Sequence, residues 1–231
     1  MGFRAVFFDV GETLVHPLPS YPELFAKVVA DAGHPRSADD VSDASRVVLR
    51  RFSEAARDRS LWTTSPERSR AFWTSVYEHM IDRLGLPGDD GLADTLYGAF
   101  TDRSNYGLFD DVAPALEALE PQVEVLGIVS NFEAWLEDLL VDLGVRDRFG
   151  VRVISGLEGI EKPDPRIYEL ALERAGVRAD ESAYVGDNPE FDVDPPAALG
   201  MFPVLVDRRG RHPDFSGLRI TDLRDLAGAL A

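Results

Sequence analysis

The chain has 231 residues, 45% hydrophobic and 28% charged, a composition typical of a globular protein with a sizeable core. It has no cysteine, which excludes disulfides, thiolate catalysis and cysteine-ligated metal centres. The formal net charge of −17 repels nucleic acid phosphates and anionic lipids, so we expect neither nucleic acid nor a membrane as a partner. The first apolar run, residues 5–8, is too short for a signal peptide, and a cytoplasmic location is expected.

The chain is predicted to begin with a buried strand over residues 3–10, a short apolar run rich in Val and Phe. From Tyr21 to Phe100 the apolar residues follow a helical period instead, and strand patterns are absent. Four helices are predicted there, and Ser37 and Ser65 have the pattern of helix caps. The residues that mark the four helices are Leu24, Phe25, Val28 and Val29; Val41, Val48 and Phe52; Phe72, Trp73, Val76, Tyr77, Met80, Ile81 and Leu84; and Leu92, Leu96 and Phe100.

Strands and helices alternate after Tyr106. Strands are predicted at 123–129, 151–155, 182–186 and 202–206, and helices at 133–143, 165–175 and 195–199. This order implies an α/β fold, a Rossmann-like parallel sheet with helices on both faces. Because the first strand lies far from its partners in sequence, a helical module is predicted to be inserted after it. The predicted α/β core comprises residues 1–16 and 106–231, and the predicted helical domain residues 17–105.

Polar residues follow the predicted strands at their carboxyl ends, where ligands bind in parallel α/β sheets. They are Asp9 after the first strand, Ser130 and Asn131 after the second, Lys162 after the third, and Asp187 and Asp192 after the fourth. Carboxylates from different strands hold Mg²⁺ well, and a lysine and a hydroxyl bind phosphate oxygens. A carboxylate next to such a site also serves as a nucleophile. The pattern therefore favours phosphoryl transfer.

With these four motifs in order, the chain resembles the hydrolases of the haloacid dehalogenase superfamily over nearly its whole length. The helical insert then matches the family's cap domain, which lies between the first and second motifs. The resemblance implies that Asp9 is the nucleophile, that Thr13 supports the loop after it, and that Lys162 neutralises the charge of phosphate and nucleophile. It also implies that Ser130 and Asn131 bind the phosphate.

The resemblance further implies a Mg²⁺ site. Its ligands would be the side chains of Asp9 and Asp187 and the backbone carbonyl of Gly11, with Asp192 close to the metal. Family phosphatases usually carry a second aspartate at the position of Gly11, where it donates a proton to the leaving group. General acid–base help of this kind is worth about 10²–10⁴ in rate. The adjacent Glu12 is expected to point elsewhere, because neighbouring residues of an extended segment face opposite ways.

The leading hypothesis is a Mg²⁺-dependent phosphatase that acts on a small phosphorylated metabolite, slowed by Gly11, with the cap closing over the substrate. In the cap, Trp62 lies in a predicted loop and is the aromatic residue expected to face the substrate. A metal-independent hydrolase similar to the 2-haloacid dehalogenases is an alternative, because a halide leaves without a proton, although Asp187 argues against it. The second alternative is a catalytically weak protein that binds phosphate and a metal ion. We assign no oligomeric state.

Overall fold

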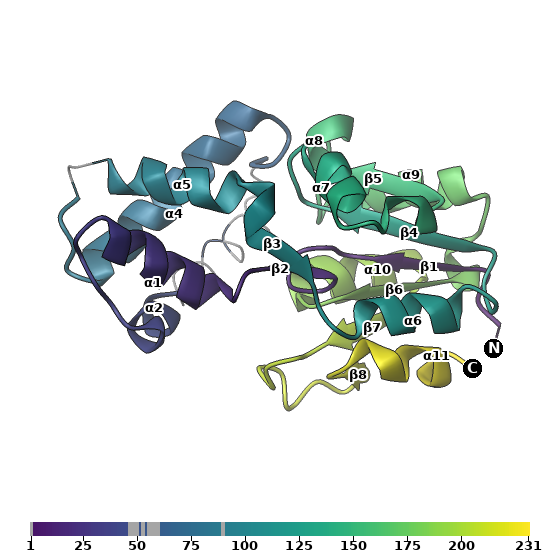
Figure 1. The fold of residues 1–231 in the computed structure, drawn as a ribbon. Coiled ribbons are helices and arrows are strands. Elements are labelled where there is room, and N and C mark those ends of the chain that lie inside the picture. The colour runs from purple at the N-terminus through teal and green to yellow at the C-terminus, as the bar shows by residue number, and fades with distance from the viewer. Residues whose placement is uncertain (1, 46–50, 52–53, 55–60, 89–90) are drawn as a thin grey trace. The chain divides into compact units, whose positions relative to one another are not determined.

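The computed structural model describes residues 2–45, 51, 54, 61–88 and 91–231. The chain forms two compact units. One comprises Met1–Val15 and Leu108–Ala231, and the other His16–Gly107. The two connections between them contain the short strands β2 (Val15–Pro17) and β3 (Tyr106–Leu108), which pair with each other (Figure 1).

A six-stranded parallel sheet forms the centre of the first unit, in the order β5-β4-β1-β6-β7-β8 (Figure 1). The strands are β1 (Ala5–Phe8), β4 (Val125–Ser130), β5 (Val151–Ile154), β6 (Ser182–Gly186), β7 (Phe202–Val206) and β8 (Leu218–Ile220). The sequence predicts all of them except β8, which has three residues and only one fully buried position. The central place of β1 puts its carboxyl end between those of β4 and β6.

Both faces of the sheet are covered. All four residues of β1 are fully buried, and successive side chains of a strand point to opposite faces. On the face of Phe7, the apolar side of helix α9 (Pro165–Ala175) packs through residues such as Ile167 and Tyr168. On the opposite face, the ring of Phe8 contacts Phe149 edge-on at 6.3 Å between centroids. The predicted Rossmann-like parallel sheet with helices on both faces is confirmed.

The other helices of this unit are short. They are α6 (Val112–Leu119), α7 (Leu136–Asp142), α8 (Ser155–Glu158), α10 (Asp194–Leu199) and α11 (Leu226–Ala229), and a turn of π-helix covers Pro189–Val193. Helix α9 has the bounds that the sequence predicts. The Asp164 side chain accepts a hydrogen bond from the backbone N–H of Arg166, and Gly176 ends the helix in a left-handed conformation.

The second unit is helical, with α1 (Tyr21–Asp31), α2 (Ala38–Ala44), α4 (Pro66–Arg83) and α5 (Leu92–Thr101) among its described residues. Ser37 and Asp40 form a reciprocal capping box at α2, and the Ser65 side chain caps α4, as the sequence predicts. The apolar faces of all four helices share one core. Val48 and Phe52, which were predicted to extend the second helix, lie outside the described residues.

Trp62 differs from its expectation. Its side chain is only 6% exposed, and its ring stacks on Phe72 with 4.3 Å between centroids. The prediction that Trp62 faces the substrate is therefore wrong, because the loop turns its indole into the core of the helical unit. Within the described residues, we also find no helix with the length and apolar character needed to cross a membrane.

Candidate active site

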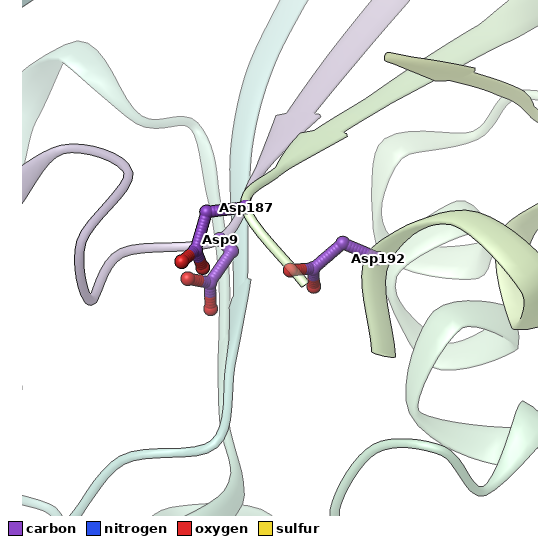
Figure 2. Close-up of side chains that lie close together, drawn as sticks. All are labelled: Asp9, Asp187 and Asp192. Carbon is purple, nitrogen blue, oxygen red and sulfur yellow. The ribbon is translucent and has the colours of Figure 1, made fainter. Parts of the chain in front are cut away.

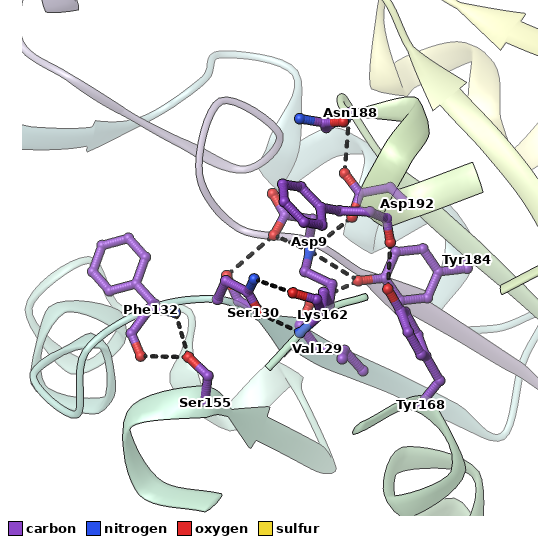
Figure 3. Close-up of polar contacts among 12 residues, drawn as sticks. Asp9, Val129, Ser130, Phe132, Ser155, Lys162, Tyr168, Tyr184, Asn188 and Asp192 are labelled. Carbon is purple, nitrogen blue, oxygen red and sulfur yellow. Dashed lines mark hydrogen bonds and ion pairs between the residues drawn. The ribbon is translucent and has the colours of Figure 1, made fainter. Parts of the chain in front are cut away.

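Asp9, Ser130 and Lys162 meet at the carboxyl edge of the sheet (Figure 3). Asp9 follows β1, and its backbone N–H still bonds to the Val185 carbonyl of β6 at 2.9 Å, which fixes its place in the sheet. The Asp9 Oδ1 atom accepts hydrogen bonds from Ser130 Oγ at 3.1 Å and from Lys162 Nζ at 2.8 Å. No residue that the structure describes donates to Asp9 Oδ2 in the same way, so this oxygen is available for another partner.

Lys162 is a buried cation between two carboxylates. Its Nζ lies 2.7 Å from Asp192 Oδ1 as well as 2.8 Å from Asp9 Oδ1, and its side chain is 3% exposed. It also donates to the Tyr184 hydroxyl at 3.3 Å. Burial alone lowers the pKa of Lys162, but the negative charges of Asp192 and Asp9 outweigh it and hold this pKa above its ordinary value. The lysine is therefore charged, and it is anchored rather than solvated.

Asn131 positions Lys162 through the backbone. Its Nδ2 donates to the Lys162 carbonyl at 2.9 Å, and its Oδ1 accepts from the Lys162 N–H at 2.7 Å. The segment after β4 is also held by Ser155, whose Oγ accepts from the Phe132 N–H at 2.9 Å and donates to the Phe132 carbonyl at 3.1 Å (Figure 3). The amide of Asn131 thus joins two loops of the site.

Three carboxylates gather beside this lysine. Asp9, Asp187 and Asp192 each offer an oxygen, and the three atoms lie within 4.8 Å of one another (Figure 2). Burial, together with the charges of Asp192, Asp9 and Glu12, raises the pKa of Asp187 well above its ordinary value. Burial likewise raises the pKa of Asp192, although Lys162 opposes the shift.

These carboxylates fit a divalent cation. One lysine cannot balance three acidic groups, and a cation would relieve their mutual repulsion. Oxygen ligands from carboxylates are also the ones that Mg²⁺ prefers. The cluster brings together the three carboxylates that the sequence analysis places at or beside the metal.

The loop after Asp9 contains the remaining predicted residues. A Cβ placed on Gly11 meets no atom within 4 Å, so the missing acidic side chain leaves open space. Thr13 is fully buried, and its hydroxyl has no hydrogen-bond partner among the residues that the structure describes. Glu12 has a φ of +57° and forms an ion pair with Arg209 at 2.7 Å. The segment is therefore not extended at Glu12, although the prediction assumed it to be, and the Glu12 carboxylate pairs with Arg209 while its charge still acts on Asp187.

Two residues of β6, Gly186 and Tyr184, shape the site, and neither was predicted as a site residue. A Cβ on Gly186 would lie 2.3 Å from Asp192 Cγ, so only glycine permits this close approach. The Tyr184 hydroxyl donates to the Val129 carbonyl at 2.7 Å and accepts from Lys162. Tyr184 reads as an ordinary core residue because only its hydroxyl reaches the site. A glycine at a predicted strand end next to an acidic motif is the signal that could have identified Gly186.

The comparisons with known proteins identify the family of the chain. The family model for haloacid dehalogenase-like hydrolases matches residues 3–200. The chain belongs to this family of hydrolases.

Named relatives within the family have different activities. Phosphoserine phosphatase of Thermus thermophilus is 37% identical, and the match covers 96% of this chain and 97% of that protein. The (S)-2-haloacid dehalogenase 4A of Burkholderia cepacia is 27% identical over 184 residues, 78% of each chain. Haloacid dehalogenase-like hydrolase domain-containing protein 3 of Mus musculus is 34% identical over 154 residues, 65% of this chain, and the match spans 61% of the mouse protein.

A solved structure shows the same fold. The hydrolase YfnB of Bacillus subtilis has a TM-score of 0.78 and 16% sequence identity, covering 100% of this chain and 99% of that one.

Proposed function

We propose that the protein is a Mg²⁺-dependent phosphatase of small phosphorylated metabolites that works through an aspartyl-phosphate on Asp9. The observation that carries this proposal is the gathering of Asp9, Asp187 and Asp192 within 4.8 Å beside a single buried lysine. An arrangement with excess negative charge is suited to a cation and, through the cation, to a phosphate group. The Thermus relative supports the phosphatase activity, because it is named a phosphoserine phosphatase.

In the first step, an oxygen of Asp9 attacks the phosphorus. Oδ2 is the oxygen suited to this role, since Oδ1 is already held by Ser130 and Lys162. The new bond joins the carboxylate oxygen to phosphorus, and the bond between phosphorus and the ester oxygen breaks. The leaving oxygen takes the electron pair and then a proton from water, because Gly11 has no side chain that can supply one.

In the second step, water attacks the phosphorus of the aspartyl-phosphate. The bond to the Asp9 oxygen breaks, which restores the carboxylate and releases inorganic phosphate and a proton. Lys162 Nζ and Ser130 Oγ, which now face Asp9 Oδ1, would also donate to phosphate oxygens and stabilise the charge of the transition state.

When bound, Mg²⁺ would supply electrostatic stabilisation of the phosphoryl oxygens. Asp9, Asp187 and the Gly11 carbonyl are the proposed ligands, and Asp192 is proposed to stand beside them. Asp192 is also positioned by the protein itself, because its Oδ2 accepts from the Asn188 N–H at 3.0 Å. Thr13 is proposed to support the loop that follows Asp9.

The helical unit, residues 17–105 in the predicted division, is proposed to act as a cap that excludes water from the substrate. Specificity then depends on residues of the cap as well as on the edge of the sheet.

A dehalogenase-like reaction is the second candidate, and Gly11 is the observation that favours it. A halide leaves without a proton, so the absent acid would cost that reaction nothing. The relative from Burkholderia is named a 2-haloacid dehalogenase. The half-buried carboxylate of Asp187 opposes this reading, because a metal-independent reaction gives no reason to place it next to Asp9 and Asp192.

The deciding experiment is phosphate release from p-nitrophenyl phosphate with Mg²⁺, for the wild type and for Asp9→Asn, with and without EDTA. This substrate has a good leaving group and does not depend on a general acid. We expect activity only in the wild type with Mg²⁺. Halide release from a 2-haloacid in the presence of EDTA, with no phosphate release, would replace the proposal by the second candidate. If neither product forms while phosphate still binds, the protein is a binding protein.

A further inference from the structure

Arg208 lies in the loop after β7 and binds to two segments that are distant in sequence. Its Nη1 and Nη2 atoms contact the two carboxylate oxygens of Asp111 at 2.6 and 2.9 Å. Nη2 also donates to the Thr13 carbonyl at 2.8 Å, and the guanidinium lies over the Phe109 ring, 4.0 Å from its centroid. The Asp111 side chain is 3% exposed and the Arg208 side chain 16%.

Thr13 belongs to a compact turn that directly follows Asp9. The Val10 carbonyl accepts hydrogen bonds from the backbone N–H groups of Leu14 and Val15, at 2.8 and 2.9 Å, and a longer one from Thr13. Gly11, whose carbonyl is a proposed metal ligand, lies inside this turn. Arg208 thus fixes the backbone of this turn to another part of the unit, and the Arg209–Glu12 ion pair adds a contact through a side chain of the turn.

Asp111, the partner of Arg208, is fixed by further hydrogen bonds. Asp111 Oδ2 also accepts from the Leu223 N–H at 2.8 Å, and the Phe109 N–H donates to the Leu14 carbonyl at 3.1 Å. Burial raises the pKa of Asp111, but its hydrogen bonds from Arg208 and Leu223 hold that pKa below its ordinary value. The Asp111 carboxylate is therefore ionised beside the Arg208 guanidinium.

We propose that Arg208 is a positioning residue that holds the turn after Asp9 and so orients the Asp9 carboxylate and the Gly11 carbonyl for the reaction. Its effect on turnover rests on the proposed phosphatase function, whereas its hold on the turn does not. Arginine suits this role because its planar fork binds both Asp111 oxygens and still reaches the Thr13 carbonyl. Lysine keeps the charge but cannot make these contacts together.

The test compares Arg208→Lys with Arg174→Lys. Arg174 makes a similar two-oxygen contact with Glu158, at 2.6 and 2.8 Å, in the last turn of α9. Hydrogen–deuterium exchange by mass spectrometry would follow a peptide that contains residues 10–15. We expect faster exchange of the Leu14 and Val15 amides in Arg208→Lys, and exchange equal to the wild type in Arg174→Lys.

Turnover gives the second measurement. With p-nitrophenyl phosphate and Mg²⁺, we expect kcat of Arg208→Lys to fall by about 10²-fold, since small displacements of reacting groups have effects of this size. KM should change much less, because substrate contacts remain. A melting curve would show that the variant is folded. Asp111→Asn, which loosens the same contact with little change in shape, should increase exchange in the same peptide and serves if Arg208→Lys does not fold.

Unchanged exchange in folded Arg208→Lys or Asp111→Asn would overturn the proposed hold on the turn. Faster exchange with unchanged kcat in an active enzyme would overturn the positioning role. If the wild type releases no phosphate with Mg²⁺, the proposed function fails, while the exchange of residues 10–15 still decides whether Arg208 holds the turn.

Discussion

Two buried ion clusters of the α/β unit differ in their charge balance. Arg208 faces one carboxylate, that of Asp111, and both of its oxygens are bound. Lys162 faces Asp9 and Asp192, and Asp187 stands next to them. The pKa of Asp111 is held below its ordinary value, whereas those of Asp187 and Asp192 are raised.

This difference separates a contact that positions a turn of the chain from a site prepared for a ligand. In the Arg208–Asp111 pair the two charges cancel, although Arg208 Nε has no hydrogen-bond partner among the described residues. An unbalanced cluster retains a charge that a further ion or a reaction must compensate, and such clusters are typical of functional sites. The predictions that follow test whether the Lys162 cluster has this character.

Asp9→Asn should have the largest effect. The amide is a poor nucleophile, so we expect hydrolysis of p-nitrophenyl phosphate to fall by about 10⁴-fold or more, to the background rate. Steady-state kinetics with Mg²⁺ would measure this. Asp214→Asn, at an exposed position of the same unit, is the control and should retain wild-type turnover. Residual activity above background in Asp9→Asn would remove Asp9 from the role of nucleophile.

Lys162→Met removes the only cation found between Asp9 and Asp192. We expect kcat to fall by about 10²–10³-fold, the size seen when one charge-stabilising donor is lost. Loss of one partner of a buried ion pair should also destabilise the fold by about 3 kcal/mol, measured by urea unfolding without metal. Full turnover in this variant would contradict a role of the lysine in the reaction and leave it a structural contact.

Gly11→Asp should restore a proton donor. The open space around the position predicts that the variant folds without a clash. We expect a gain of about 10-fold or more on alkyl phosphates, within the range of general acid catalysis, and little change with p-nitrophenyl phosphate. Comparing kcat/KM on the two substrates separates this effect from a general change. No gain on alkyl phosphates in a folded variant would show that another step limits turnover.

Mg²⁺ should stabilise the protein more at pH 8 than at pH 5. A carboxyl whose pKa is raised in the folded state binds more protons there than in the unfolded chain. Its contribution to stability is therefore lost as the pH rises through the folded pKa, about 6 for Asp192. Mg²⁺ competes with these protons, so its effect grows with pH.

Melting curves with Mg²⁺ or EDTA at the two pH values would measure this difference. Asp187→Asn is the informative variant, because it keeps the shape of the side chain but lacks its charge. We expect its Mg²⁺-dependent change in Tm to be small at both pH values. A Tm that does not respond to Mg²⁺ in the wild type would show that the unbalanced carboxylates are not a metal site.

Much of the fold follows from local signals in the sequence. The bounds of α9 and β6 are as predicted, because a cap, a proline and a glycine mark the helix and a fully buried apolar run marks the strand. The π-helical turn at Pro189–Val193 was not predicted, because neither helical nor strand periodicity describes five residues. Strand β8 was missed because it is a short edge strand.

The candidate site was predictable where its residues end strands. Ser130 and Lys162 lie 121 and 153 residues beyond Asp9, yet the parallel order of the strands places all three at one edge. Contacts outside that pattern were not predictable. Arg208 and Asp111 are 97 residues apart in loops, and no period or spacing connects them. The amide of Asn131 could not be assigned to the backbone of Lys162 because only the folded loop brings the two together.

The central position of β1 also governs how the chain folds. Its neighbours in the sheet, β4 and β6, lie far towards the C-terminus in sequence. During synthesis β1 therefore stays unpaired until these later segments have left the ribosome. Closing such large loops slows folding, whereas the helices of residues 16–107 depend on nearer contacts. Until its neighbours are made, both edges of this apolar strand are unpaired, and unpaired strands of different chains can associate. The pairing of β6 with β1 covers the last free edge and removes this site of association.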